Sequence, residues 1–216
     1  MKSCLRASLG FLVLCLLAAF VDADQHSFVL EEEFRHVTCQ SALKLANKKL
    51  GCRLHSLGIT YGTGSGQQAV TCLPAADDAG SYFLVRTAFG TPDCPRGTPI
   101  PCGTVIRLLH QGTKTSLHSH AAHKSPLTRN QEVSAYSGSD KGDDWRLVCA
   151  KSSDKYWDRE TEVKLQHVET GKYLSAASGS TYNVKPPGQL EVSAVGHTGA
   201  EQTWIAQEGI YFGKPE

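Results

Sequence analysis

The segment Leu54-His55-Ser56 returns as Leu117-His118-Ser119, 63 positions further along the chain, and this repetition decides the fold. Gln68-Ala69-Val70-Thr71 and Gln131-Glu132-Val133-Ser134 are related by the same offset. Three pairs of single residues keep it as well: Cys39 and Cys102, Leu43 and Ile106, and Tyr82 and Trp145. Landmarks that share one offset indicate two copies of one unit with no net insertion between the landmarks.

A third, fainter copy follows the first two. Val163-Lys164-Leu165-Gln166-His167 matches Ile106-Arg107-Leu108-Leu109-His110 at an offset of 57. Leu190-Glu191-Val192-Ser193 matches the segment 131–134 at an offset of 59, and Trp204 matches Trp145. The change of offset indicates a small net insertion inside the third copy.

Each copy is predicted to form four short strands. The first strand has apolar residues at alternate positions, as in Leu43 and Leu45, and a period of two places such residues on one face. In the first copy, the second strand is centred on Leu54, the third on Val70, and the fourth begins at Tyr82. One such unit cannot bury its own apolar face, whereas three units around a pseudo-threefold axis share one core. The sequence therefore predicts an all-β protein with a β-trefoil fold, and a propeller is disfavoured because propellers typically have about four or more blades.

The N-terminus predicts export. Lys2 and Arg6 precede an apolar run, Leu9–Val21, which is too short to span a bilayer, since a span needs about 20 residues. The run ends in Val21-Asp22-Ala23, a small-residue pattern that signal peptidase accepts. Residues 1–23 are therefore expected to be a cleaved signal peptide.

The remaining chain is expected to hold one domain. It contains no second apolar run of membrane length, so no membrane insertion is expected, and its charge does not predict nucleic-acid binding. The formal net charge is +1, with acidic and basic residues interspersed. The expected parts are an N-terminal extension at 24–36, a trefoil domain at 37–212 and a tail at 213–216, with repeats at about 37–92, 93–151 and 152–212.

Six cysteines follow the predicted signal peptide, and an even number in an exported chain favours disulfides over metal ligation. Cys39 and Cys102 hold equivalent repeat positions. We therefore predict that each closes its own unit, Cys39 with Cys94 and Cys102 with Cys149.

Cys52 and Cys72 lie at the ends of the predicted second and third strands of the first copy. If these strands form an antiparallel hairpin, the two ends meet and a third disulfide can form. Two buried free thiols are the alternative.

Several strings carry a resemblance to a known family. Tyr61–Gln68 reads YGTGSGQQ, Arg96–Ile100 reads RGTPI, and Ser125-Pro126-Leu127 is followed by Asn130–Ala135, which reads NQEVSA. Together with both Leu-His-Ser segments and Asp143-Asp144-Trp145, these strings closely resemble the stromal cell-derived factor 2 family, whose members consist of three MIR repeats. The resemblance extends from about Val37 to Phe212.

The resemblance implies a β-trefoil of the endoplasmic reticulum lumen, present as a monomer within a larger complex. Members of the family associate with a lumenal J-domain co-chaperone and, through it, with the BiP chaperone. They act in folding quality control and suppress the aggregation of unfolded client proteins.

Two features depart from the family pattern. The chain ends in Gly213-Lys214-Pro215-Glu216, with no retention tetrapeptide, so secretion is the alternative to residence in the lumen. Cys52 and Cys72 are additional to the four cysteines that are usual in the family.

The most suggestive metal-binding pattern is His118, His120 and His123, because the first two would share one face of a strand. His55 is the repeat equivalent of His118 and has no such companions. The repeat therefore explains the pattern without a metal, and no metal site is predicted.

Catalytic residues and cofactors are not predicted either. Asp77-Asp78 and Asp143-Asp144 precede the fourth strand at nearly equivalent repeat positions, which favours a structural turn over a catalytic carboxylate pair. Trp145 and Trp204 are predicted to be core residues, whereas Tyr156-Trp157 has no repeat equivalent and is the better surface candidate.

A lectin-like trefoil, linked to protein O-mannosylation or glycoprotein recognition, is the alternative function. Trefoils host many lectins, and MIR repeats also occur in protein O-mannosyltransferases, although a shared fold alone does not establish function. The polar residues that could line a glycan groove near the second and third strands are Arg53, His55, Tyr61, His118, His120 and Gln131.

Overall fold

The computed structural model describes residues 30–214, so the predicted signal peptide, the first part of the N-terminal extension and the last two residues lie outside the described range. No helix within this range is both long and apolar enough to cross a membrane. The elements are η1 (Glu32–Phe34), β1 (Ala42–Asn47), β2 (Cys52–Thr60), β3 (Gln68–Leu73), η2 (Ala79–Ser81), β4 (Phe83–Thr87), β5 (Val105–His110), β6 (Ser116–Lys124), β7 (Gln131–Tyr136), η3 (Lys141–Asp143), β8 (Trp145–Cys149), β9 (Glu162–His167), β10 (Tyr173–Thr181), β11 (Leu190–Val195), η4 (Ala200–Gln202) and β12 (Trp204–Ile210), where η denotes a 3-10 turn.

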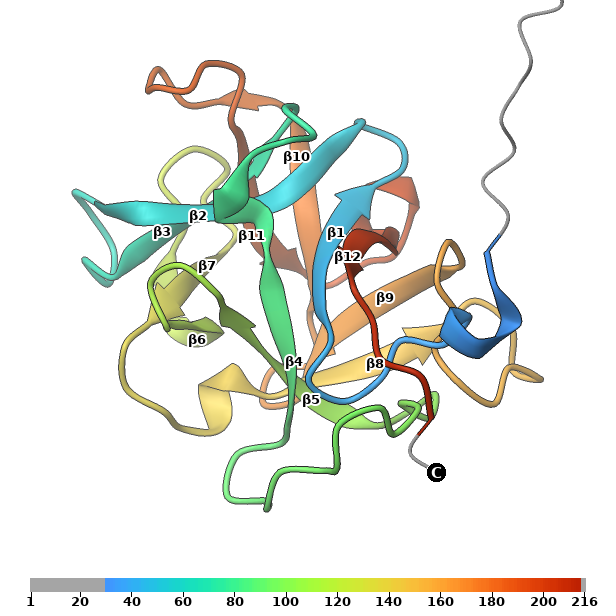
Figure 1. Cartoon of the computed structure of the whole chain (residues 1–216). Helices are drawn as coiled ribbons and strands as arrows, with labels where there is room; N and C mark the ends of the chain where they lie inside the picture. The colour runs from blue at the N-terminus through green and yellow to red at the C-terminus, as the bar shows by residue number, and fades with distance from the viewer. Residues whose placement is uncertain (1–29, 215–216) are drawn as a thin grey trace, which may run out of the picture.

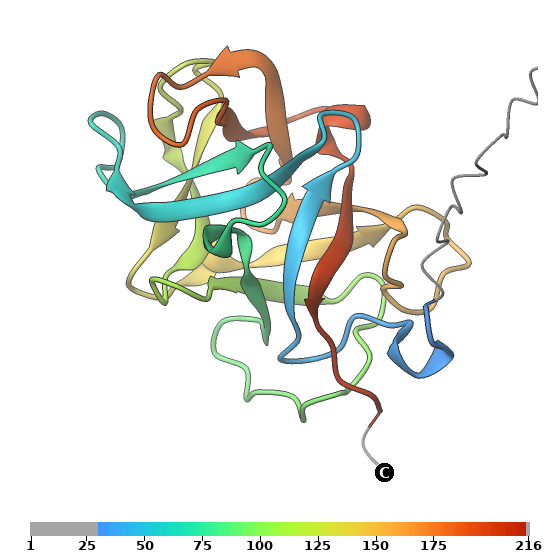
Figure 2. The same ribbon diagram turned by 45° about the horizontal axis from the view of Figure 1, so that its top comes forward.

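Six of the strands close into a barrel in the circular order β1, β4, β5, β8, β9, β12 and back to β1, with every pairing antiparallel. The other six strands form three hairpins, β2–β3, β6–β7 and β10–β11, and the inner strands β3, β7 and β11 pair with one another. Figures 1 and 2 show the β2–β3 hairpin projecting away from both ends of the described chain. Three units of four strands around a shared core make up the predicted β-trefoil.

Strands β5 and β9 bury alternate residues, as the period of two predicts, whereas all six residues of β1 are buried. Leu43 and Leu45 on β1 are completely buried, and the same positions of β5 and β9 are also buried. Trp145 and Trp204 begin β8 and β12 in the core. Trp145 Nε1 donates to the carbonyl of Leu117 at 3.0 Å, so its only polar group is satisfied.

The first unit differs from the predicted alignment by one residue. Phe83, and not Tyr82, is the counterpart of Trp145, because Phe83 pairs with His110 as Trp145 pairs with His167. Phe83 is completely buried, whereas Tyr82 lies before β4 and is partly exposed. The predicted equivalence of Tyr82 and Trp145 was therefore wrong, since the first unit has one residue more between β3 and β4 than the second unit has between β7 and β8.

A ring of three backbone hydrogen bonds closes the barrel at the end where the first strand of each unit begins. Val37 N donates to Trp157 O at 2.8 Å, Trp157 N donates to Ile100 O at 2.8 Å, and Ile100 N donates to Val37 O at 3.0 Å. All three side chains are buried in the core. The predicted surface position of Trp157 was therefore wrong, although Tyr156 is 41% exposed.

The cysteines form the two predicted pairs, Cys39–Cys94 and Cys102–Cys149, and Cys52 and Cys72, for which free thiols were the alternative, form a third bridge. The second bridge joins β2 to β3 inside the first hairpin, and both of its cysteines are completely buried. In the second hairpin, Thr115 and Ala135 hold the equivalent positions. The bridge is thus an addition to a hairpin that also forms without it.

A buried side chain ties the first strand of each unit to the 3-10 turn of another unit. The contacts are Asn47 Nδ2 to Glu201 O at 2.8 Å, His110 Nε2 to Gly80 O at 3.0 Å and His167 Nε2 to Gly142 O at 3.1 Å. Burial lowers the pKa of both histidines, and the hydrogen bond to the carbonyl opposes this shift only partly. The neutral imidazole, which donates from Nε2, is therefore the form that the fold needs.

Replacing Trp157 with alanine should lower the free energy of unfolding by about 3–5 kcal/mol, because a large buried side chain leaves the closed end of the barrel. Tyr156→Ala is the matched control, and it should change that free energy by only about 0.5 kcal/mol because Tyr156 is exposed. Urea unfolding followed by far-ultraviolet circular dichroism measures both. Equal losses in the two variants would contradict the role assigned to the ring.

The double variant Cys52→Thr, Cys72→Ala copies the second hairpin and should fold. Loss of a bridge that closes a loop of this length should cost about 3 kcal/mol, which corresponds to a melting temperature lower by about 6–12 °C. Scanning calorimetry without reductant measures the difference. An unchanged melting temperature would show that the bridge does not stabilise the fold.

In the double variant His110→Asn, His167→Asn, all three units have asparagine at the position of Asn47, which does not titrate. The free energy of unfolding of this variant should depend less on pH. Because the folded-state pKa of each histidine lies below its unfolded value, the unfolded chain binds more protons. The stability from these histidines is complete above about pH 6.5 and is lost as the pH falls toward the folded pKa. Urea unfolding at about pH 7.5 and about pH 5.5 should thus show a larger loss for the parent than for the variant. If the free energy of unfolding falls by the same amount in both proteins between these two pH values, the role assigned to the two histidines is wrong.

Candidate functional site

The six residues predicted to line a glycan groove do not come together in one. His120 is exposed, and Arg53 is partly buried beside Glu208, with Arg53 Nη2 2.9 Å from Glu208 Oε1. The other four are buried and hydrogen-bonded within the protein: His55, Tyr61, His118 and Gln131. Most of these polar groups are therefore used by the fold itself.

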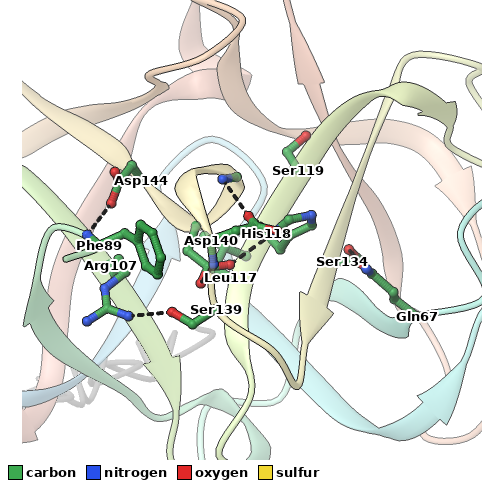
Figure 3. Close-up of polar contacts among 12 residues, drawn as sticks. Gln67, Phe89, Arg107, Leu117, His118, Ser119, Ser134, Ser139, Asp140 and Asp144 are labelled. Carbon is green, nitrogen blue, oxygen red and sulfur yellow. Dashed lines mark hydrogen bonds and ion pairs between the residues drawn. The ribbon is translucent and has the colours of Figure 1, made fainter.

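His118 belongs to a polar cluster with two carboxylates of the turn η3 (Figure 3). His118 Nδ1 lies 3.0 Å from Asp143 Oδ1 and 3.6 Å from Asp140 Oδ1. Asp140 accepts from Gly142 N at 2.7 Å and Asp143 accepts from Asp140 N at 3.3 Å, which forms a capping box on the turn. The companions of His118 are thus carboxylates, not His120 and His123, and this donor set has a spacing that a metal ion could use.

In the other two units, different side chains make the equivalent contact between the second strand and the 3-10 turn. In the first unit, His55 Nε2 lies 3.4 Å from Asp78 Oδ1, and in the third, Gln202 Nε2 donates to Ser175 Oγ at 2.6 Å. Each contact joins the second strand of a unit to its 3-10 turn. This repetition explains the His118 cluster as a structural contact, because Ser175 and Gln202 perform the same task without an ionisable group.

Of the four aspartates predicted to hold turns before the fourth strands, Asp78 and Asp143 do so, but the alignment of the two pairs differs. Asp78 caps η2 by accepting from Gly80 N at 2.7 Å, and its counterpart is Asp140, which caps η3. Asp144 accepts from Phe89 N at 2.8 Å and so ties a neighbouring loop to the start of β8 (Figure 3).

Two buried glutamates clamp the loops of the hairpins. Glu132 on β7 accepts from Ser65 N at 3.3 Å and from the Ser65 hydroxyl, in the loop of the first hairpin. Glu191 on β11 accepts from Leu127 N at 2.6 Å and Thr128 N at 2.9 Å, in the loop of the second hairpin. Each clamp fastens the loop of one hairpin to the inner strand of the next, and the donors satisfy a carboxylate that burial would otherwise disfavour.

The third clamp is absent, and a cavity takes its place. The strand registers show that Ala69 on β3 is the counterpart of both glutamates, and a methyl group cannot hold the loop at 182–189. A cavity of about 330 Å³ lies between the first and third hairpins. Its largely apolar lining includes Leu57, Ile59, Ala69, Pro126, Tyr182 and Val184.

Two tyrosines line the same cavity. Tyr61 is buried, and its hydroxyl lies 3.0 Å from the carbonyl oxygens of both Val70 and Val133. Tyr182 donates to Glu191 Oε2 at 3.3 Å. Burial raises the pKa of both phenols, so they stay protonated and keep these hydrogen bonds. Both hydroxyls form hydrogen bonds within the protein, so the surface of the cavity is mainly carbon.

Of the six predicted groove residues, Tyr61 alone lines this cavity. The signal for the cavity is nevertheless present in the repeat. Where the second and third copies have Glu132 and Glu191, the first copy has Ala69. The sequence did not predict what these positions contact, because the loops that they face lie about one repeat away in the chain.

Comparisons with known proteins agree with the predicted resemblance. Residues 53–198 match the MIR domain family. Stromal cell-derived factor 2-like protein 1 of Bos taurus is 47% identical over 176 residues, which cover 81% of this chain and 78% of the relative. The crystal structure of the SDF2-like protein from Arabidopsis thaliana has a TM-score of 0.78 and 38% identity, and the match covers 84% of this chain and 99% of that chain.

A more distant solved structure is the protein O-mannosyltransferase Pmt1–Pmt2 complex of S. cerevisiae, bound to the sugar donor. It has a TM-score of 0.72 at 24% identity, and the match covers 89% of this chain but 29% of that chain. This likeness shows a shared fold alone. The identity and coverage of the nearer relatives establish more: the chain belongs to the stromal cell-derived factor 2 family of MIR-domain β-trefoils.

Proposed function

We propose that the protein is a non-catalytic binding subunit of a complex between a lumenal J-domain co-chaperone and a BiP-type chaperone. In this complex it would limit the aggregation of unfolded clients in the endoplasmic reticulum lumen. The match over 81% of the chain to stromal cell-derived factor 2-like protein 1 carries the proposal, because resemblance to this family implies a role in folding quality control.

The form of the site supports binding to unfolded chains. Unfolded chains expose apolar side chains, and the cavity beside Ala69 offers a largely apolar surface at the hairpin end of the molecule. Three disulfides and a closed barrel hold this surface in place. A preformed site loses little conformational entropy on binding, which favours useful affinity from a small contact.

The polar clusters of the described residues also favour binding over catalysis. His118 and Asp143 have structural counterparts in Ser175 and Gln202, and Glu132 and Glu191 hold loops. These groups are engaged in hydrogen bonds that the fold needs. A glycan site has less support, because the predicted polar groove is not formed and the cavity is largely apolar.

The test is affinity capture of a tagged copy from the secretory pathway of its host, followed by quantitative mass spectrometry. We expect a J-domain protein and BiP to be enriched over an unrelated exported trefoil used as bait. In a second assay, the purified protein should slow the aggregation of a reduced client, measured by light scattering. Recovery of neither chaperone, with the bait found in the medium, would refute the proposal.

A control must separate a complex subunit from a client of BiP. The destabilised variant Trp157→Ala shows how much BiP binds to the bait merely because it is unfolded. An ATP wash releases BiP from clients, and the J-domain protein should remain on the parent bait after this wash. If the J-domain protein is captured only with the destabilised variant, the protein is a client and not a subunit.

A further inference from the structure

The cavity beside Ala69 lies where the repetition of the glutamate clamps is broken. Glu132 and Glu191 each fill the space under a hairpin loop and bind its backbone, whereas Ala69 leaves the corresponding space open. The cavity therefore arises from one specific residue of the first unit. Ala69→Glu is the substitution that should fill it, and both other units show that a glutamate fits the equivalent position.

The size and rim of the cavity suit a single apolar group. Its volume of about 330 Å³ is at the lower end of the range of roughly 300–1,000 Å³ for ligand pockets. Ile59 and Val184 at the rim are 50% and 41% exposed. Large apolar side chains that gather at an open pocket mark an interaction site. One aromatic or branched aliphatic side chain fits within this space.

An irregular strand borders the cavity. The register of β2 against β3 shifts between Ser56 and Thr60, so that Leu57, Gly58 and Ile59 have no Cα partner in this ladder. The space beside Gly58 is open, since an added Cβ there would meet no atom within 4 Å. An extended peptide can lie along such a segment, pair with its backbone and place alternate side chains in a pocket.

The loops around the cavity carry positive charge on the outside. In the hairpin segments 57–71, 120–134 and 177–193, the exposed charged residues are Lys124, Arg129 and Lys185. None of the three has an ion-pair partner among the described residues. The carboxylates of these segments, Glu132 and Glu191, are buried in the clamps. The surface around the apolar pocket is therefore complementary to a negatively charged partner.

We propose that the cavity binds extended acidic peptide segments through one large apolar side chain. The apolar side chain enters between Ile59 and Val184, the peptide backbone lies along Leu57–Ile59, and carboxylates on either side face Lys124 and Lys185. This inference rests on the proposed function, because it names the class of client segment that the subunit would recognise.

The test is isothermal titration of the purified protein with a capped heptapeptide, Asp-Asp-Thr-Phe-Thr-Asp-Asp. We expect saturable binding of one peptide per protein, weakened by salt because the carboxylate contacts are exposed. Replacing the central Phe with Ser should weaken binding by about tenfold or more, since the anchor is lost. Replacing all four Asp with Lys should weaken it as well.

Matched variants locate the site. Val184→Asp should weaken binding by about tenfold or more, whereas Val168→Asp, at a residue with nearly the same exposure (42%) outside the cavity, should not. Lys185→Glu should weaken binding, and the exposed Lys151→Glu in the loop after β8 should not. Ala69→Glu should abolish binding. Equal melting temperatures of Val184→Asp and Val168→Asp would establish that both remain folded.

Three results would overturn the inference: no peptide binding, equal binding of the Phe and Ser peptides, or equal binding by the Val184→Asp and Val168→Asp variants. Binding of dodecanoate, blocked by Ala69→Glu, without any binding of peptide would also overturn it and would make the cavity a site for small amphiphiles. The titration contains no chaperone, so a failed chaperone capture and a failed peptide titration are separate outcomes.

Discussion

The closed barrel is the constraint on which the rest of the structure depends. Val37, Ile100 and Trp157 exchange backbone hydrogen bonds in a ring, so buried amides that would be left unpaired at an open end are satisfied. Because six strands close on themselves, the three hairpins must meet around one axis, where β3, β7 and β11 pair. This meeting brings together loops and inner strands that are about one repeat apart in the chain, and every contact at the candidate site follows from it.

Threefold repetition preserves structural tasks while the side chains that perform them change. Asn47, His110 and His167 each bind the carbonyl of a 3-10 turn. Likewise, the hairpin is hydrogen-bonded to its 3-10 turn by His118 with Asp143 in the second unit and by Ser175 with Gln202 in the third. A polar cluster that has such counterparts needs no functional explanation. A position that lacks its counterpart is more informative, and Ala69 is such a position: the missing carboxylate leaves an open apolar space and no unpaired charge.

Prediction from the sequence succeeded where it depended on periodicity and failed where it depended on neighbours in space. The repeat and its alternating apolar residues led to the trefoil, and the equivalence of Cys39 and Cys102 led to the correct bridges. The match of Tyr82 to Trp145 failed because strand register, and not distance along the chain, decides which residue enters the core. Trp157 was taken for a surface residue because its equivalents are Val37 and Ile100, whose likeness lies in backbone position and not in side-chain type.

The sequence by itself determined the number of repeats, the fold class, two of the three disulfide pairs and the family, because each of these follows from spacing or from local strings of residues. The tertiary structure alone decided which polar residues remain available. His55, His118 and Gln131 have the chemistry of a binding site, yet the fold buries them, and His55 Nδ1, His118 Nδ1 and Gln131 Nε2 form hydrogen bonds within the protein. The cavity was equally hidden, although Ala69 differs visibly from Glu132 and Glu191. The effect of a missing carboxylate depends on the loop packed above it, and only the folded chain brings that loop to that strand.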